Sequence, residues 1–243
     1  MRPTFLFAAV GVFLTVGLLA AGAPGVKEKV EPDKPETADM YAATTENLKK
    51  IALSFHEFHD THGKLPANAI KGDVPLLSWR VRVLEFLDGG AHADLYKAFK
   101  LDEPWDSDHN KKLIDKMPRI YAPLRGKAKA GETFYQSFQG KDGMMQPGGV
   151  TLAGVTDGLS NSFMVAEADK PVIWTRPDDI EFDGKTAPAL GGMFKDHFFV
   201  AFGDGSVRKM PKRMDRNTLV ASITINGGEV FDLDAAVESA EKK

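Results

Sequence analysis

Cysteine is absent from the 243 residues of the chain. Its absence excludes disulfide bonds, thiolate metal sites and a cysteine nucleophile, but it does not exclude an oxidising compartment. A charge excess of either sign is also missing, since 31 basic residues stand against 34 acidic ones and the formal net charge is −3. No basic block rises above this background, so we expect no nucleic-acid partner.

Recognisable catalytic and phosphate-binding motifs are missing as well. The chain has no Gly-x-Ser-x-Gly elbow for a serine nucleophile. Its paired glycines, at 148–149, 191–192 and 227–228, lack the spacing and the Lys-Ser/Thr end of a phosphate loop. With 43% apolar and 27% charged residues, the composition is that of an ordinary globular protein. We therefore predict a protein without enzymatic activity or a cofactor.

The first 23 residues have the features of a targeting segment. Arg2 supplies a positive start, an almost uninterrupted apolar run follows from position 5 to position 20, and Ala21-Gly22-Ala23 offers the small residues of a cleavage site. The apolar stretch 5–23 counts 19 residues, close to the roughly 20 that a membrane-spanning helix needs. Residues 1–23 are thus either a signal peptide or a membrane anchor. Both alternatives predict an extracytoplasmic protein, which is periplasmic, at the cell surface or secreted.

The rest of the chain divides into three segments. Residues 24–38 hold three prolines and alternating charges, which is typical of a flexible linker. We predict one folded domain over 39–232 and a charged, disordered tail over 233–243. Within the domain the helices come first and the strands follow, which indicates the α+β class.

A long amphipathic helix is predicted from position 37 to position 62. Its apolar residues recur at spacings of three and four and make one stripe, which comprises Leu48, Ile51, Ala52, Phe55 and Phe58. Gly63 is suited to the C-cap, and Pro66 prevents the helix from resuming. Shorter helices are expected over 78–88, 91–99 and 110–116.

The stretch 198–210 predicts a β-hairpin with a Gly203-Asp204-Gly205 turn. Its first strand carries apolar residues on both faces, from Phe198 to Phe202, so we expect it in the centre of a sheet. Further strands are expected among the stretches 133–138, 150–156, 163–168, 172–175 and 217–225.

Two groups of side chains raise the question of a metal site, and a structural role is favoured for both. His56, His59 and His62 follow one another on the long helix, but no carboxylate or fourth ligand is paired with them. Residues 102–108 include four acids without the Asp-x-Asp-x-Asp-Gly pattern of a calcium loop. Helix capping by Asp106 or Ser107 is the favoured interpretation there, and we predict no metal site.

Polar residues gather again between 157 and 167. Asp157 and Ser160, with a histidine still to be identified, would suit a hydrolase, but Asx-turns by Asp157 and Asn161 and capping by Ser160 are favoured. Glu167 ends an apolar strand; if it is buried, it must pair with Arg or Lys or have a raised pKa. The chain has three tryptophans, Trp79, Trp105 and Trp174. Each either fills the core or offers its ring to a ligand.

Seven motifs in order resemble one family. They lie at 47–59, 63–66, 77–81, 100–107, 156–161, 173–177 and 202–207. Two of them read Thr156-Asp157-Gly158-Leu159-Ser160-Asn161 and Phe202-Gly203-Asp204-Gly205-Ser206-Val207. Together, over about residues 40–232, they are similar to the large paralogous planctomycete family catalogued as domain of unknown function 1559.

The resemblance implies an α+β, pilin-like fold, related to type IV pilins or type II secretion pseudopilins: an N-terminal helix packed on an antiparallel sheet, with short helices inserted between helix and sheet. It transfers no catalytic residues. The family motif residues, of unknown role, are Asp157, Gly158, Ser160, Asn161, Asp204 and Gly205. The chain departs from the family in lacking a Gly-Phe prepilin site and in carrying Phe194, not histidine, ten positions before Asp204.

From these features we expect a non-enzymatic pilin-like or pseudopilin-like structural or interaction protein of the cell envelope. Its partners would be other envelope proteins or further copies of itself, with the membrane as a contact if residues 1–23 are uncleaved. The tryptophans and acidic turns suggest an alternative, a secreted carbohydrate- or small-ligand-binding module. A third hypothesis is a hydrolase that uses Asp157, Glu167 or Asp204.

Overall fold

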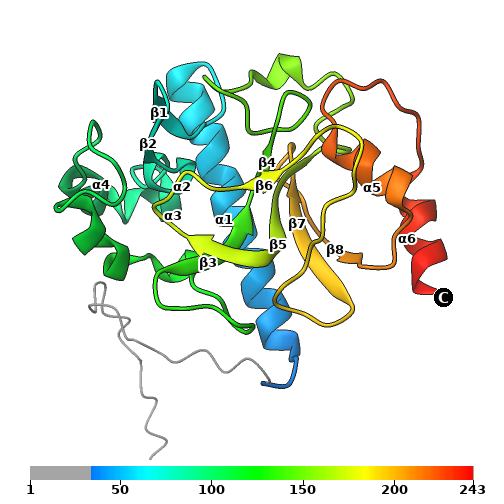
Figure 1. Ribbon diagram of the computed structural model, residues 1–243. Helices are drawn as coiled ribbons and strands as arrows, with labels where there is room; N and C mark the ends of the chain where they lie inside the picture. Colours follow the sequence, from blue (N-terminus) through cyan, green and yellow to red (C-terminus); the bar gives the residue numbers. More distant parts are fainter. Residues whose placement is uncertain (1–33, 243) are drawn as a thin grey trace, which may run out of the picture.

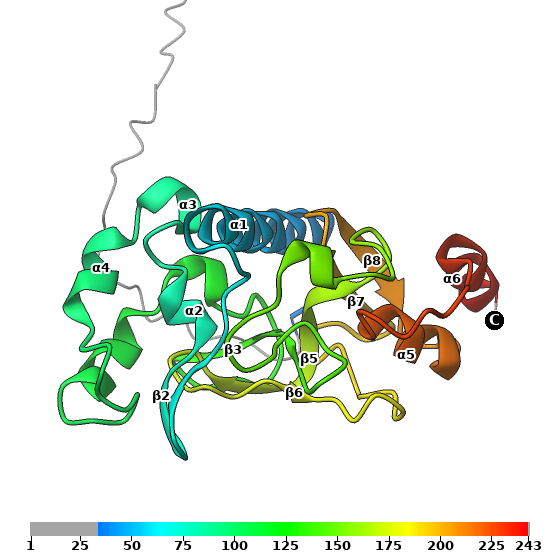
Figure 2. The ribbon, with the colours of Figure 1, turned by 90° about the horizontal axis from the view of Figure 1, so that it is seen from above.

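A long helix on an antiparallel sheet forms the centre of the molecule (Figures 1 and 2). The computed structural model describes residues 34–242. The helix is α1 (Ala38–His62). The sheet has the strand order β3-β5-β7-β8, and its strands are β3 (Glu132–Gln136), β5 (Phe163–Ile173), β7 (His197–Phe202) and β8 (Val207–Pro211). All neighbouring pairs are antiparallel, so the predicted α+β class, with an N-terminal helix on an antiparallel sheet, is confirmed.

Helix α1 begins and ends where its capping residues predict. The Thr37 side chain accepts a hydrogen bond from the Met40 N–H, and Gly63 takes the left-handed conformation with φ of 74°. The apolar stripe is buried from Leu48 to Phe58. Because this stripe faces the sheet, its burial holds the helix in place.

The predicted hairpin forms from β7 and β8. Strand β7 lies between β5 and β8, which confirms its central position. Its side chains are buried on both faces from Phe198 to Phe202, whereas Lys209 in β8 is exposed. Gly205 has φ of 84°, the conformation that the tight turn requires.

The sheet separates two hydrophobic clusters. The first lies between α1 and the sheet and includes Leu48, Tyr135 and Phe199. The second covers the opposite face, where Phe163 and Phe198 pack with residues from α5 (Arg216–Ile223), α6 (Leu233–Glu241) and a small sheet. That small sheet pairs β4 (Phe138–Gln139) with β6 (Ile180–Glu181) in parallel.

Short elements occupy the chain between α1 and β3, as the sequence predicts. They are β1 (Ala69–Lys71), β2 (Val74–Leu77), α2 (Trp79–Arg82), α3 (Leu87–Gly90), α4 (Ala93–Ala98) and the 3-10 helices η1 (Asn110–Lys116) and η2 (Arg119–Tyr121). A third 3-10 helix, η3 (Leu152–Gly154), precedes β5. The helix expected over 78–88 is regular only in α2, and turns follow it at 83–86.

Four expectations about the second half are wrong. The stretch 150–156 contains the 3-10 helix η3 and no strand. The stretches 163–168 and 172–175 belong largely to the single strand β5, which continues through Asp169 to Pro171. The stretch 217–225 is mostly helix α5, which the Asp215 side chain caps. The tail 233–243 contains helix α6, where Asp232 is the N-cap and Leu233 and Ala240 are buried.

The end of the predicted linker 24–38 is held on the domain. The Glu36 carboxylate pairs with Arg125 Nη1 at 2.9 Å and accepts hydrogen bonds from the Tyr41 hydroxyl and the Lys195 N–H. Glu36 is therefore held by contacts, and positions 24–33 of the predicted linker lie outside the described residues. Residues 34–242 include no helix that is long and apolar enough to cross a membrane, and the predicted signal peptide or anchor at 1–23 lies outside the described residues.

Candidate functional site

The polar motif residues meet at one end of the sheet. The Gly203 N–H donates to the Ser162 carbonyl at 2.9 Å, and the Asp204 N–H donates to the Leu159 carbonyl at 3.1 Å. The turn between β7 and β8 therefore sits directly against the loop 157–162. We call residues 157–162, 203–206 and 224–228 together the loop junction.

Within the loop junction, Asp157 holds a third segment in place. Its two carboxylate oxygens accept hydrogen bonds from the Gly227 N–H at 2.7 Å and the Gly228 N–H at 2.9 Å. Its carbonyl accepts from the Asn161 side chain at 3.1 Å. Both residues thus have a structural role, but neither forms the predicted Asx-turn, because the Asp157 carboxylate bonds a distant loop and the Asn161 amide donates to a carbonyl four residues earlier.

Ser160 and Asp204 do not complete a catalytic arrangement with Asp157. Ser160 is exposed, and its hydroxyl makes no hydrogen bond to another described residue. The Asp204 carboxylate accepts from the Ser206 N–H at 2.9 Å, two residues further on, as in an Asx-turn. The two aspartates lie on separate turns and bond different backbone groups, so the geometry weighs against the hydrolase hypothesis.

The histidines of α1 lie on its C-terminal half, and their rings do not meet at one position where a metal ion could bind. A Cβ placed on Gly205 would lie 3.8 Å from His56 Nε2, so this ring borders the loop junction. The His62 ring stacks on Phe58 with centroids 4.0 Å apart, and His59 lies 3.7 Å from Asp60. Across residues 34–242, no three His, Cys, Asp or Glu side chains group in a way that could hold a metal ion.

The acidic turn 102–108 bonds within itself and to the following helix. Glu103 accepts hydrogen bonds from Lys100 and from the Ser107 hydroxyl, each at 2.8 Å. The Ser107 hydroxyl also accepts from the Asn110 N–H at 3.1 Å, at the start of η1. Ser107 thus has the capping role that the sequence favours there.

Two of the three tryptophans are core residues. Trp79 and Trp174 are fully buried, and each indole N–H is satisfied, by Asp179 at 3.0 Å and by the Ile114 carbonyl at 2.9 Å. Trp105 is half-buried, and the Arg176 guanidinium lies 5.7 Å from its ring centroid. Of the three, Trp105 alone retains a partly accessible ring for a ligand.

A buried polar network that the sequence does not indicate ties α2 to the sheets. Arg80 Nη2 lies 2.9 Å from Asp179 Oδ1, with both side chains fully buried. Arg80 Nε also donates to the Tyr135 carbonyl, and Asp179 accepts from the Ser137 N–H and from the Asn68 side chain. The two charged residues are 99 positions apart, so no spacing rule pairs them.

Glu167 is fully buried in the sheet, on the side that α1 covers. Burial raises its pKa well above the ordinary value, and the Phe199 N–H, which donates to Oε2 at 3.2 Å, opposes the rise. It forms no ion pair with a described residue. Of the two alternatives expected for a buried Glu167, an ion pair with Arg or Lys and a raised pKa, the structure favours the raised pKa.

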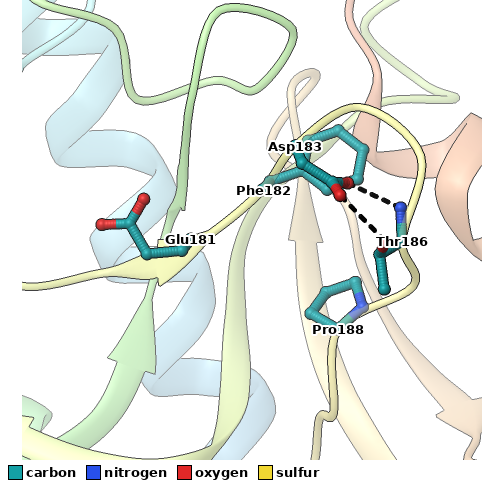
Figure 3. A pocket seen from close by; sticks show the side chains of 5 residues that line it. All are labelled: Glu181, Phe182, Asp183, Thr186 and Pro188. Carbon is teal, nitrogen blue, oxygen red and sulfur yellow. Dashed lines mark hydrogen bonds between the residues drawn. The ribbon is translucent and has the colours of Figure 1, made fainter.

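A surface pocket of about 360 Å³ lies beside β6 and the loop after it (Figure 3). The Asp183 carboxylate points at Thr186 and accepts hydrogen bonds from its N–H at 2.6 Å and its hydroxyl at 2.9 Å. Those bonds, led by that of the Thr186 N–H, hold the pKa of Asp183 below its usual value. Glu181 points away from them, so the pocket brings no acid–base pair together. None of Asp157, Glu167 and Asp204 lines it.

Comparison with known proteins identifies part of the chain. No curated protein and no solved structure matches it. One family model, SBP_bac_10, described as "Protein of unknown function (DUF1559)", matches residues 42–124. The match covers most of α1 and the short elements after it, and ends before β3. The resemblance is thus supported for the first part of its range, whereas the planctomycete origin and the Asp204-Gly205 motif stay predictions. Residues 42–124 are thus similar to the DUF1559 family, whose function is unknown.

Proposed function

We propose that the protein is a non-enzymatic, extracytoplasmic structural or interaction protein of the cell envelope, of the pilin-like or pseudopilin-like kind. One observation carries the proposal: α1 lies along one face of an antiparallel four-stranded sheet, with its apolar stripe buried against it. This arrangement is the one expected of a pilin-like domain. A likeness of fold does not by itself define a function, so location and partners must be tested directly.

The extracytoplasmic location is supported by the sequence of residues 1–23. A positive residue, an apolar run and small residues follow one another as in a signal peptide or an anchor. The contacts of Glu36 with Arg125 and Lys195 fix the place where the chain enters the domain, which lies beside the start of β7. Such a fixed entry suits a domain that is tethered through its N-terminal end.

A role without catalysis is supported by what the motif residues do. Asp157, Asn161 and Asp204 direct their polar atoms to backbone groups of the loop junction. Side chains whose polar atoms are hydrogen-bonded to backbone groups of the loops are not free to bind and activate a substrate. We therefore infer that the loop junction is a rigid surface, and that the partners are other envelope proteins or further copies of the chain.

Fractionation of native cells, with N-terminal sequencing, tests the location. We expect the protein in the envelope or an exported fraction, either intact or beginning close after Ala23. The variant Leu14→Arg, which places a charge in the apolar run, should accumulate in the cytosol. A wild-type protein that is cytosolic and unprocessed would contradict the proposal.

Chemical crosslinking in intact cells tests the interaction role. We expect reproducible adducts with an envelope protein or with a second copy of the chain, and fewer of them for Leu14→Arg. Wild-type protein that reaches the envelope but yields no adduct above this control would count against the role and leave the location standing.

A secreted carbohydrate- or small-ligand-binding module is the alternative, and Trp105 is the observation that favours it. Its ring is partly accessible and lies beside Arg176, and aromatic rings of this kind can hold sugars. A glycan array that gives binding to the wild type and none to Trp105→Ala would support this alternative. An array without a hit would remove it.

A further inference from the structure

Glu167 lies at the interface between α1 and the sheet. Its partner across β3 is Tyr135, which belongs to the hydrophobic cluster on the α1 side, so Glu167 points toward the same side. The side chain is 0% exposed. Oε2 accepts from the Phe199 N–H at 3.2 Å, whereas Oε1 has no hydrogen-bond partner among the described residues.

Uncharged polar groups from two elements, β3 and α1, are buried on the same side of the sheet as this carboxyl. The Tyr135 hydroxyl comes from β3 and is buried next to Thr44 and Asn47 of α1. The hydroxyls of Thr44 and Tyr135 have no partner at hydrogen-bond distance among residues 34–242. Each of these hydroxyls can accept a hydrogen bond, and a protonated carboxyl can donate one, which a carboxylate cannot.

Charged and titratable groups act on Glu167 only from a distance. Lys212, which follows β8, favours the carboxylate, but its ammonium group donates to the Phe194 carbonyl at 2.6 Å. Glu36, which precedes α1, disfavours the carboxylate. His197 of β7, whose pKa burial lowers, faces Glu36 and Lys212. No described cation forms an ion pair with Glu167, so its ionised form would be a buried charge without a counter-ion.

We propose that the contact between α1 and the sheet depends on a proton held by Glu167, and that loss of this proton as the pH rises loosens the helix from the sheet. In the protonated form the carboxyl carries no charge, which suits an interface that is closed to solvent. In the ionised form it is a buried charge without an ion pair, and parting α1 from the sheet would admit water to it. This inference is independent of the envelope location proposed above.

The direction of the pH dependence follows from the two states of the chain. In the unfolded chain Glu167 titrates near its ordinary pKa of 4.5, and in the folded protein burial raises that pKa. The folded state therefore binds more protons between the two values, and stability decreases as the pH rises through this window. A difference of one proton lowers the equilibrium constant for folding at most about tenfold per pH unit.

The test compares the full chain with Glu167→Gln, a neutral side chain of nearly the same shape. Urea unfolding is measured from about pH 5 to about pH 9. We expect the wild type to lose stability across this range and Glu167→Gln to lose less of it, by up to about tenfold in the equilibrium constant for each pH unit. The matched control, Glu46→Gln, changes an exposed carboxyl on α1 and should keep the wild-type slope.

A direct measurement decides the question even if Glu167→Gln fails to fold. Infrared spectroscopy of the wild type, begun at the acid end of the same pH range, should show the carbonyl band of a protonated carboxylic acid, which Glu46→Gln retains and which disappears as the pH is raised. Hydrogen exchange of α1 amides should accelerate over the same range, beyond the change in intrinsic exchange. Absence of the protonated band, or a wild-type slope in Glu167→Gln, would overturn the proposal.

Discussion

Arg80 and Asp179 form an ion pair that is closed to solvent, with Nη2 and Oδ1 2.9 Å apart and both side chains fully buried. The pair connects α2 to the segment before β6, and Asp179 also accepts from the Trp79 indole. A buried pair of this kind is costly to break on one side, because the remaining charge stays in the interior.

Removal of Asp179 should destabilise the fold strongly. Asp179→Ala leaves the Arg80 guanidinium buried and unpaired, so we expect the free energy of unfolding to fall by about 3–5 kcal/mol. Urea unfolding at neutral pH measures the change. Asp94→Ala serves as the control, since Asp94 pairs with Lys97 at 3.5 Å on the surface and should not affect stability measurably. Equal effects of the two substitutions would show that the buried network is not needed.

Two leucines of α1 test whether the helix packs on the sheet as described. Leu48 is fully buried and Leu53 is 55% exposed. Leu48→Ala should cost about 2–5 kcal/mol, because it leaves a cavity in the cluster between helix and sheet. Leu53→Ala should change the free energy of unfolding by less than about 0.5 kcal/mol. Similar losses for both variants would contradict the packing of α1.

Asp157 tests the role of the loop junction. Asp157→Ala removes the acceptors of the Gly227 and Gly228 N–H groups, and we expect a loss of about 1–2 kcal/mol in the free energy of unfolding. Ser160→Ala should be neutral, because its hydroxyl bonds no described residue. Thermal unfolding of the two variants gives the comparison. A neutral Asp157→Ala would contradict its role in loop closure.

The pKa of Glu36 predicts how the stability of the protein changes at acidic pH. Burial raises its pKa, but the Lys195 N–H, the Tyr41 hydroxyl and the Arg125 guanidinium together bring it below the ordinary value of 4.5. Its contribution to stability is therefore complete above about pH 4.5 and is lost as the pH falls through the lower, folded value. Glu36→Gln should make acid unfolding less steep.

The control for this acid response is Glu238→Gln. Glu238 pairs with Lys242 on the surface of α6, with both side chains largely exposed. The substitution should leave the acid unfolding curve unchanged. If Glu36→Gln also leaves it unchanged, the ion pair with Arg125 does not contribute to stability.

Local sequence predicts the elements that local interactions determine. Helix α1 is predicted by its apolar spacing and by Gly63, and the β7–β8 hairpin by its period of two and its Gly203-Asp204-Gly205 turn. Asn161, whose side chain donates to the Asp157 carbonyl four residues earlier, has the local structural role that its residue type favours. These features depend on residues close together in the chain.

The sequence does not predict features that depend on residues far apart in the chain. No pattern connects Arg80 with Asp179, because the two meet only after α2 has packed against the sheets. The charged sequence of residues 233–243 predicts a disordered tail, yet it forms helix α6, because Leu233 is buried in the cluster that includes residues of α5. In β5, Pro171 suggests a break between two strands, but the strand continues through it.

The contacts of Glu36 have a mechanical consequence. A tensile load applied through the N-terminal segment would meet the Glu36–Arg125 pair and the Lys195 hydrogen bond before it reached the buried stripe of α1. These contacts would therefore rupture first and shield the helix from peeling off the sheet under weak force. Because Arg125 and Lys195 would stay in place on the folded domain, both contacts with Glu36 would form again once the load is removed.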